Sequence, residues 1–425
     1  MKEIKHIITR IIHSSVAKNG AWMYALQIFN TVIPLLTLPY ITRVLGIAEY
    51  GAFSIAVNII GYLQVVVEYG FGMSVTRRIS LANQEKTILN NSFTNVLYSR
   101  LLLTIGCFGF GGIYYILNQG KDERAICLFI LMISLLGYCV QQNYMFQGLM
   151  DMKYISILNI FTRTISVMLT FFLVKDSSDI FIYCLLYSLP SFLSGFFGLI
   201  LAKIKYKLTL IKTNWRNVFS ELKDGVYVFS TQLSSKVFSA IGITFLGVFA
   251  SKSEVGAFSA IQKIPSLLIL VWAPFGQVIY PVTSRKMSGG FSEGVKYVYK
   301  LRRYILPLFI MLSITIGIFS NPIVRLLFGE EYVNNAFWVL PLLAWVIVSI
   351  NNNFLGSQIL LAGGHDKEYS IVFQIGVVLT IIINFFLVYF FHGIGAAWAP
   401  LISDLILGLM LYAQIQTLKK KERYK

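Results

Sequence analysis

The chain has 425 residues, of which 56% are hydrophobic and only 13% are charged, and its mean hydropathy is +0.69. A soluble globular domain carries about 25% charged residues, so the composition excludes a soluble protein and indicates an integral membrane protein. The formal net charge of +17 could attract nucleic acid or anionic lipid, and the positions of the basic residues decide between them.

The first 19 residues are predicted to form an amphipathic helix lying in the membrane interface. Isoleucines occupy positions 4, 7, 8, 11 and 12, which is the i, i+3, i+4 spacing of one helical face. Lys2, Lys5 and Arg10 lie elsewhere on that helix. An apolar face beside basic residues is typical of a helix that lies on anionic lipid.

Twelve apolar stretches follow, each long enough to cross a bilayer, which needs about 20 residues. They cover about 20–43, 49–72, 92–117, 125–148, 154–174, 180–202, 225–250, 255–284, 304–320, 333–361, 368–391 and 394–417. The sequence therefore predicts an all-α membrane protein with about twelve transmembrane helices.

Basic residues are distributed unevenly between the two sides of this predicted topology. With a cytoplasmic N-terminus, 26 Lys and Arg residues fall in cytoplasmic segments and six fall outside. This bias fits the positive-inside rule, so both termini are predicted to be cytoplasmic. The basic charge is then expected to face membrane lipid, and no nucleic-acid partner is expected.

One six-residue phrase occurs twice in the chain. Glu49–Ser54 reads EYGAFS and Glu254–Ser259 reads EVGAFS, 205 positions later, each near the start of a predicted span. Two weaker echoes have offsets of 210 and 215: QQN at 141–143 with NNN at 351–353, and DMKY at 151–154 with DKEY at 366–369. We interpret these echoes as a parallel repeat, with halves at 20–202 and 225–417, a basic linker at 203–224 and a basic tail at 418–425. A duplication retained only for packing is the alternative.

Six charged residues lie inside predicted spans, where each charge costs about 2.5–3.5 kcal/mol on insertion scales. Four are cations and two are anions, so a cavity that they lined would be net positive: Arg100, Arg163, Lys236, Lys263, Glu68 and Asp404. Such a cavity would attract an anionic substrate, most simply a phosphate or pyrophosphate. Mutual ion pairing, for example of Arg100 with Glu68, and snorkelling to the membrane surface are the alternatives.

Two amide runs inside spans are candidates for sugar contacts. They are Gln141, Gln142 and Asn143 in the fourth span, and Asn351, Asn352 and Asn353 in the tenth. Amides offer both donors and acceptors to sugar hydroxyls. Hydrogen bonds between helices, worth about 0.6 kcal/mol each in membranes, are the alternative role.

No pattern indicates an enzyme, a metal site or a bound cofactor. The four cysteines form no C-x-x-C pair, the four histidines are scattered, and no P-loop for ATP is found. The predicted outside loops are short, whereas a membrane glycosyltransferase or acyltransferase is expected to carry a larger loop with catalytic residues. A transporter is therefore predicted.

The residues resemble bacterial O-antigen flippases of the polysaccharide transporter family, which share a superfamily with multidrug and toxin extruders and lipid II flippases. The resemblance rests on LPYITRVLGIAEYGAFS at 38–54, VEYGFGMSVTRRIS at 67–80 and NPIVRLLFGEEY at 321–332. It implies a MATE-like, V-shaped pair of six-helix bundles with a cationic lumen.

The resemblance also implies the activity. An undecaprenyl-pyrophosphate-linked oligosaccharide, an O-antigen or capsule repeat unit, would move by alternating access from the cytoplasmic to the outer leaflet of the bacterial inner membrane. Asp404 and Glu68 would be the candidates for proton coupling, and a polysaccharide polymerase and glycosyltransferases would be the functional partners. A cation-coupled multidrug extruder of the same fold and a membrane glycosyl- or acyltransferase are the competing hypotheses.

Overall fold

The computed structural model describes residues 15–82, 85–118 and 121–423, and these residues form helices with no strand among them. Of the predicted interfacial helix, residues 1–14 lie outside this described part of the chain. The predicted all-α fold is confirmed. In chain order the helices are α2 (Ser15–Glu68), α3 (Phe71–Leu81), α4 (Lys86–Leu117), α5 (Glu123–Leu131), α6 (Ile133–Val140), α7 (Asn143–Gly148), α8 (Met152–Leu173), η1 (Ser177–Asp179), α9 (Ile180–Tyr206), α10 (Trp215–Phe249), α11 (Lys252–Ile261), α12 (Lys263–Ser288), α13 (Phe291–Ile318), α14 (Ser320–Phe328), η2 (Glu330–Trp338), α15 (Val339–Leu355), the π-helical turn η3 (Gly356–Leu361) and α16 (Asp366–Arg423).

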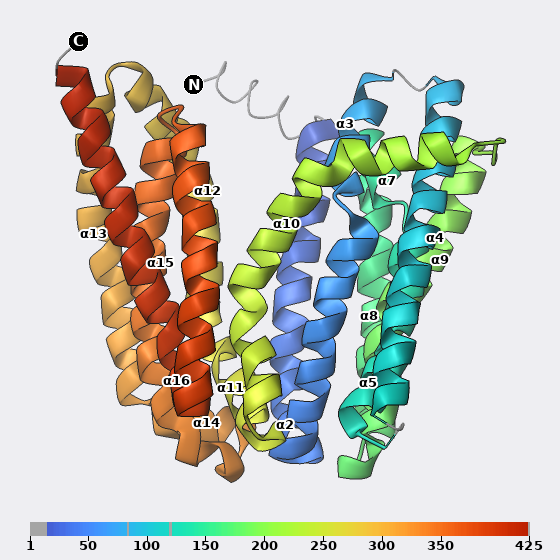
Figure 1. The fold of residues 1–425 in the computed structure, drawn as a ribbon, viewed down its shortest axis with the longest axis horizontal. Coiled ribbons are helices and arrows are strands. Elements are labelled where there is room, and N and C mark those ends of the chain that lie inside the picture. The colour runs from blue at the N-terminus through green and yellow to red at the C-terminus, as the bar shows by residue number, and fades with distance from the viewer. Residues whose placement is uncertain (1–14, 83–84, 119–120, 424–425) are drawn as a thin grey trace, which may run out of the picture. The chain divides into compact units, whose positions relative to one another are not determined.

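Ten helical segments in the described residues are long and apolar enough to cross a membrane. Two of them, Lys18–Leu81 and Asp366–Lys420, have 64 and 55 residues, and a single crossing needs only about 20. Each is interrupted by a residue with non-helical backbone angles, Gly46 (φ 79°) in the first and His392 (φ 47°) in the second. The ribbons of α2 and α16 each turn back on themselves (Figure 1). Counting each long segment as two crossings agrees with the predicted twelve.

The chain forms two compact units whose boundaries lie inside helices. The first unit runs to Leu45 and resumes over Ile55–Lys236, and the second contains Gly46–Ser54 and the chain from Val237 onward. The predicted halves follow the sequence repeat and are divided by the linker. The boundaries of these units fall instead within α2 and α10. The first part of α10 packs with the first unit, and a short piece of α2 packs with the second.

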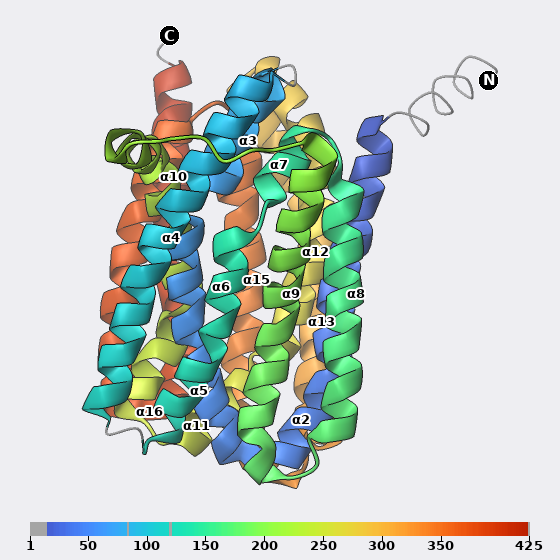
Figure 2. The same ribbon diagram turned by 90° about the vertical axis from the view of Figure 1, so that its right-hand side faces the viewer.

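Close backbone contact holds α6 against α9 in the first unit, where the two helices run side by side (Figure 2). A Cβ atom on Gly137 would lie 2.1 Å from the carbonyl oxygen of Ser191, and one on Gly195 would lie 2.2 Å from the carbonyl oxygen of Gly137. Small residues are used in this way in membranes because helix association there depends on van der Waals packing rather than on a hydrophobic driving force.

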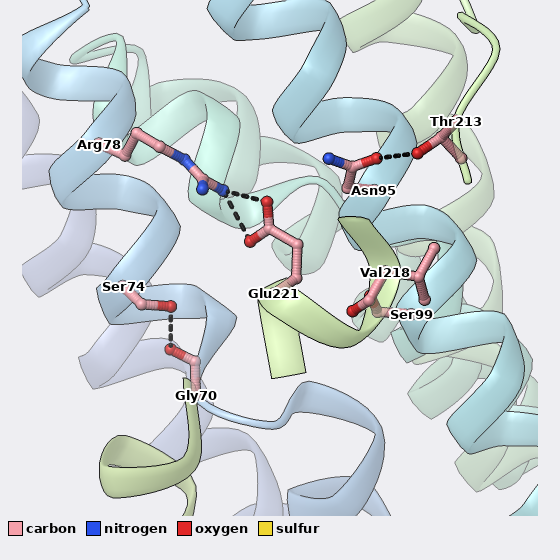
Figure 3. Close-up of polar contacts among 8 residues, drawn as sticks. All are labelled: Gly70, Ser74, Arg78, Asn95, Ser99, Thr213, Val218 and Glu221. Carbon is pink, nitrogen blue, oxygen red and sulfur yellow. Dashed lines mark hydrogen bonds and ion pairs between the residues drawn. The ribbon is translucent and has the colours of Figure 1, made fainter. Parts of the chain in front are cut away.

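Hydrogen bonds fasten the predicted linker, 203–224, to the first unit (Figure 3). The Thr213 hydroxyl donates to Asn95 Oδ1 at 2.6 Å, and Arg78 Nη2 donates to both carboxylate oxygens of the buried Glu221 at 2.8 Å. This ion pair joins α3 to the first turns of α10. The linker is therefore a packed element of the first unit.

The repeated phrase forms a reciprocal contact inside the second unit. A Cβ atom on Gly51 would lie 1.9 Å from the carbonyl oxygen of Lys252, and one on Gly256 would lie 1.9 Å from the carbonyl oxygen of Ile47. The two glycines are 205 positions apart, and so are the two residues whose carbonyl oxygens they face, as are the two copies of the phrase. The glycine of each copy therefore leaves room for the backbone just before the other copy. This mutual contact explains why the phrase occurs twice.

The glutamate of the second copy has two structural roles. Glu254 forms a capping box with Ser251 at the start of α11, in which each side chain accepts a hydrogen bond from the backbone of the other residue. Its Oε1 also accepts a hydrogen bond from the backbone N–H of Gly393, beside the break in α16. The phrase thus holds the start of α11 against the point where α16 turns.

A polar cluster closes the turn between α7 and α8, where the DMKY echo lies. Asp151 accepts hydrogen bonds from Lys205 Nζ and from the Tyr206 hydroxyl, both at 2.6 Å. Burial by itself raises the pKa of Asp151, but the two hydrogen bonds outweigh it and hold the pKa below its ordinary value. The carboxylate is therefore charged at neutral pH and joins the end of α9 to this turn.

Candidate functional site

Arg163 lies on α8 in the first unit, on a helix that crosses the membrane. Its Nη1 donates a hydrogen bond to Asn30 Oδ1 of α2 at 2.9 Å. Asn30 is neutral, so this hydrogen bond orients the guanidinium without cancelling its charge. A half-buried cation held in this way is suited to binding an anion through its remaining N–H groups.

Lys236 lies on α10, at the end of the first unit, and its ammonium group rests on α2. The Nζ atom is 5.6 Å from the centre of the Tyr62 ring, within the range of a cation–π interaction. A Cβ atom on Gly61 would lie only 2.4 Å from the same Nζ. The absence of a side chain at position 61 therefore makes room for the ammonium group.

Enlarging Gly61 is expected to displace Lys236 without unfolding the protein. The Gly61→Ala variant places a methyl group where the ammonium group lies, and the flexible lysine side chain can move away. We expect export activity in cells to fall about tenfold, roughly 1.4 kcal/mol, while the amount of protein in the membrane stays the same. Gly109→Ala is the matched control, because nothing lies within 4 Å of a Cβ there. Unchanged export by Gly61→Ala would contradict a role for the position of Lys236.

Glu68 lies on the same stripe of α2 as Gly61, seven residues later. Its Oε1 accepts a hydrogen bond from Gln64 Nε2 at 3.2 Å. Along this stripe of α2, Gly61, which faces the Lys236 ammonium group, is followed by the amide of Gln64 and the carboxylate of Glu68. The structure thus brings the ammonium group of Lys236, from α10, against the same stretch of α2 that carries Glu68.

Arg100 is 4% exposed and lies on α4. One of its guanidinium nitrogens, Nη1, donates to the backbone carbonyl of Gln141, where α6 ends, and its Cζ atom lies 5.8 Å and 5.3 Å from the ring centres of Phe71 and Tyr144. The pairing with Glu68 considered from the sequence is thus replaced by a backbone carbonyl and two aromatic rings. In this conformation Arg100 stabilises a helix end, and its contact with substrate stays a prediction.

The first amide run lies at the break between α6 and α7. Gln142 is 1% exposed, and its Nε2 donates to the backbone carbonyl of Val140 at 2.9 Å. Gln141 is also buried, and Asn143 begins α7. Two of these three amides therefore lie inside the bundle at the helix break, while their role as sugar contacts stays untested.

The remaining predicted residues lie in the second unit. Lys263 begins α12 and is exposed. Asp404 on α16 is 2% exposed, and its Oδ2 accepts a hydrogen bond from Trp345 Nε1 at 2.9 Å. The carboxyl group is thus held by a neutral donor from α15.

The second amide run faces α16 and α12. Asn352 Nδ2 donates to the backbone carbonyl of Asp404 at 2.6 Å, and Gly408 leaves the space that the Asn352 side chain occupies. Asn353 Oδ1 lies 3.7 Å from where a Cβ on Gly276 would be. Asn351 is partly buried. Asn352 thus forms a hydrogen bond between helices, which is the alternative role considered from the sequence. Sugar contact by this run remains a prediction.

Some residues of the site were missed from the sequence. Asn30 and Trp345 are polar or amphipathic residues within apolar spans, and each is identified by its hydrogen bond to an ionisable residue. Gly61 is one of 32 glycines in the chain, so composition could not distinguish it. A polar residue within a predicted span is the one signal that could have selected Asn30 as a candidate.

Two curated relatives are similar to the chain over nearly its whole length. A protein of Escherichia coli (strain K12) named "Putative O-antigen transporter" is 26% identical over 400 residues, covering 93% of this chain and 96% of that protein. A protein of Haloferax volcanii named "Probable low-salt glycan biosynthesis flippase Agl15" is 24% identical over 392 residues, covering 91% of this chain and 80% of its own length.

Solved structures share the fold at low sequence identity. The lipid II flippase MurJ in an inward closed conformation superposes with a TM-score of 0.70 at 15% identity, covering 94% of this chain and 87% of that chain. An inward-facing MATE-family multidrug resistance transporter gives a TM-score of 0.66 at 14% identity, covering 92% and 99%. The family profile described as "Polysaccharide biosynthesis protein" matches residues 16–287, which is more than half of the chain. The chain therefore belongs to this polysaccharide biosynthesis protein family.

Proposed function

We propose that the protein is a flippase that moves an oligosaccharide linked to a polyprenyl pyrophosphate, by alternating access, from the cytoplasmic to the outer leaflet. The observation that carries the proposal is Arg163, a cation on a membrane-crossing helix that is hydrogen-bonded by the neutral amide of Asn30. Together with Lys236 on the same unit, it provides positive charge for the pyrophosphate group.

The family and its relatives support the substrate class. The family description names polysaccharide biosynthesis, and the names of the two relatives concern O-antigen transport and a glycan biosynthesis flippase. A repeat unit of O-antigen or capsule on undecaprenyl pyrophosphate has both features that such a substrate needs. It carries a glycan, and it carries a pyrophosphate that the cations Arg163 and Lys236 can bind. A polymerase and glycosyltransferases that finish and supply such units are the functional partners that we infer.

We further infer that the protein lies in a bacterial inner membrane with both termini in the cytoplasm. The distribution of 26 against six basic residues supports this orientation. Anionic lipid headgroups would then lie against the basic segments, including the linker fastened to the first unit.

Asp404 is the stronger candidate for proton coupling. It is a buried carboxyl group on a crossing helix and accepts a hydrogen bond from Trp345, so gaining or losing a proton would change the hydrogen bonding between α15 and α16. In proteoliposomes, we expect the flipping rate of the Asp404→Asn variant to be the same with and without an imposed proton gradient. Glu68→Gln is the comparison, and retained gradient dependence in Asp404→Asn would assign the coupling elsewhere.

The test of the proposed function uses cells that lack the protein. Lipid-linked glycans are located with a membrane-impermeant glycan-modifying probe applied to spheroplasts and to inverted vesicles. We expect complete units to accumulate on the cytoplasmic leaflet and to clear when the gene is restored. Normal arrival at the outer leaflet without the protein would refute the proposal and leave multidrug extrusion as the next activity to assay.

A further inference from the structure

Helix α9 exposes an aromatic residue on the side opposite its apolar exposed face. The exposed apolar side chains lie mainly on one side of the helix: Ile182, Leu185, Phe196, Phe197, Ile200 and Ile204. At about 100° per residue, Tyr187 lies about 140° around the helix from the middle of that face. Tyr187 is nevertheless 42% exposed, so its exposed surface lies away from the face that is suited to lipid.

Two hydrogen bonds between α8 and α9 place Tyr187 at the level of Arg163. The Thr162 hydroxyl donates to the backbone carbonyl of Pro190 at 3.4 Å, and the Ser166 hydroxyl donates to that of Leu186 at 2.6 Å. Arg163 lies between the two donors on α8, and Tyr187 lies between the two acceptors on α9. The charge of Arg163 accordingly acts on the hydroxyl group of Tyr187.

A second tyrosine lies at the same level on α6. The close contact of Gly137 with Ser191 brings α6 against α9, and the Tyr138 hydroxyl accepts a hydrogen bond from Ser191 Oγ at 3.1 Å. The charges of Arg163 and Glu68 both act on this hydroxyl group. Three helices of the first unit therefore bring two tyrosines and a serine beside the candidate pyrophosphate-binding arginine.

The chemistry of this cluster matches a sugar. A tyrosine ring offers a flat apolar face for the C–H face of a pyranose, and its hydroxyl group can both donate to and accept from sugar hydroxyls. Gln142 and Asn352 are buried and use their amides inside the protein, whereas Tyr187 is well exposed. Tyr187 is thus better placed than those two amides to contact a glycan.

We propose that Tyr187, together with Tyr138 and Ser191, binds the first sugar of the glycan, the one attached to the pyrophosphate. The inference rests on the proposed function, because Arg163 must hold the pyrophosphate for the adjoining sugar to reach this cluster. Tyr187 is then a residue that determines affinity for the glycan and has no role in holding the lipid carrier.

Binding measurements with two probes test this assignment. Purified protein in nanodiscs is titrated with undecaprenyl pyrophosphate, which has no sugar, and with the lipid-linked glycan extracted from cells lacking the protein. The variants are Tyr187→Leu, Arg163→Gln and Phe196→Leu. Phe196 is the matched control, an exposed aromatic residue on the apolar face of the same helix. Thermal unfolding of each variant confirms that it is folded.

We expect Tyr187→Leu to weaken binding of the glycan-bearing lipid about tenfold and to leave binding of the sugar-free lipid within about twofold. Arg163→Gln should weaken both, and Phe196→Leu neither. Equal effects of Tyr187→Leu on the two probes, or no effect on either, would overturn the inference while leaving the flippase proposal intact. Failure of the unaltered protein to bind either probe would overturn both.

Discussion

Replacing Arg163 by glutamine is expected to reduce export of the lipid-linked glycan about 100-fold while the protein remains in the membrane. The size of the effect follows from the loss of a charge-assisted contact with a pyrophosphate, which costs about 2–5 kcal/mol in a desolvated setting. Asn30 would keep a neutral hydrogen-bonding partner, so the packing of α2 against α8 should persist. Export is measured as accessibility of the glycan to the impermeant probe in spheroplasts.

Two further variants decide whether charge or geometry carries the effect. Arg163→Lys keeps the charge without the planar guanidinium, so it should retain more export than glutamine does. Arg325→Gln is the matched control, because Arg325 forms an exposed ion pair with Glu330 and should tolerate the change. Full export by both Arg163→Gln and Lys236→Ala would refute a cationic binding site.

Adding a methyl group to either glycine of the repeated phrase is expected to destabilise the protein strongly. In Gly51→Ala and in Gly256→Ala the new Cβ would lie 1.9 Å from a backbone carbonyl oxygen, which cannot swing away as a side chain can. Each change should therefore cost about 3 kcal/mol or more, because one helix start must move from the other. Thermal unfolding in detergent and the abundance of the protein in membranes measure the loss.

The two glycines should also be coupled. Once the helix starts have separated to admit one methyl group, the second meets less resistance, so the double variant should cost less than the sum of the single variants. Gly106→Ala is the control, since nothing lies within 4 Å of its Cβ and alanine is favoured over glycine in a helix by about 0.5–1 kcal/mol. Single variants as stable as the unaltered protein would disprove the contact.

Predictions that depend on short stretches of sequence agree with the structure. A span is recognisable because about 20 consecutive apolar residues are needed to cross a bilayer, and that requirement is local. The two longest helical segments obscure this agreement only because Gly46 and His392 turn the chain within a continuous helical stretch. Family membership, too, was recognisable from short ordered motifs, and the profile match over residues 16–287 confirms it.

The position of a charge in a span was predictable, but its partner was not. Arg100 and Arg163 are equivalent by sequence, since both are arginines within apolar helices. The fold turns Arg100 toward a backbone carbonyl at the end of α6 and turns Arg163 toward an amide on α2. The difference comes from which helix lies opposite each face, and no local pattern contains that information.

Hydropathy and spacing within single segments are enough to recognise a membrane protein with about twelve predicted spans, the positions of its charged residues along them, and a repeated phrase. The mutual glycine contact of that phrase, the position of the Lys236 ammonium group against Gly61, and the common level of Tyr187 and Arg163 are visible only in the folded chain. Each of these contacts joins different helices, and close backbone approach in a membrane depends on both surfaces at once.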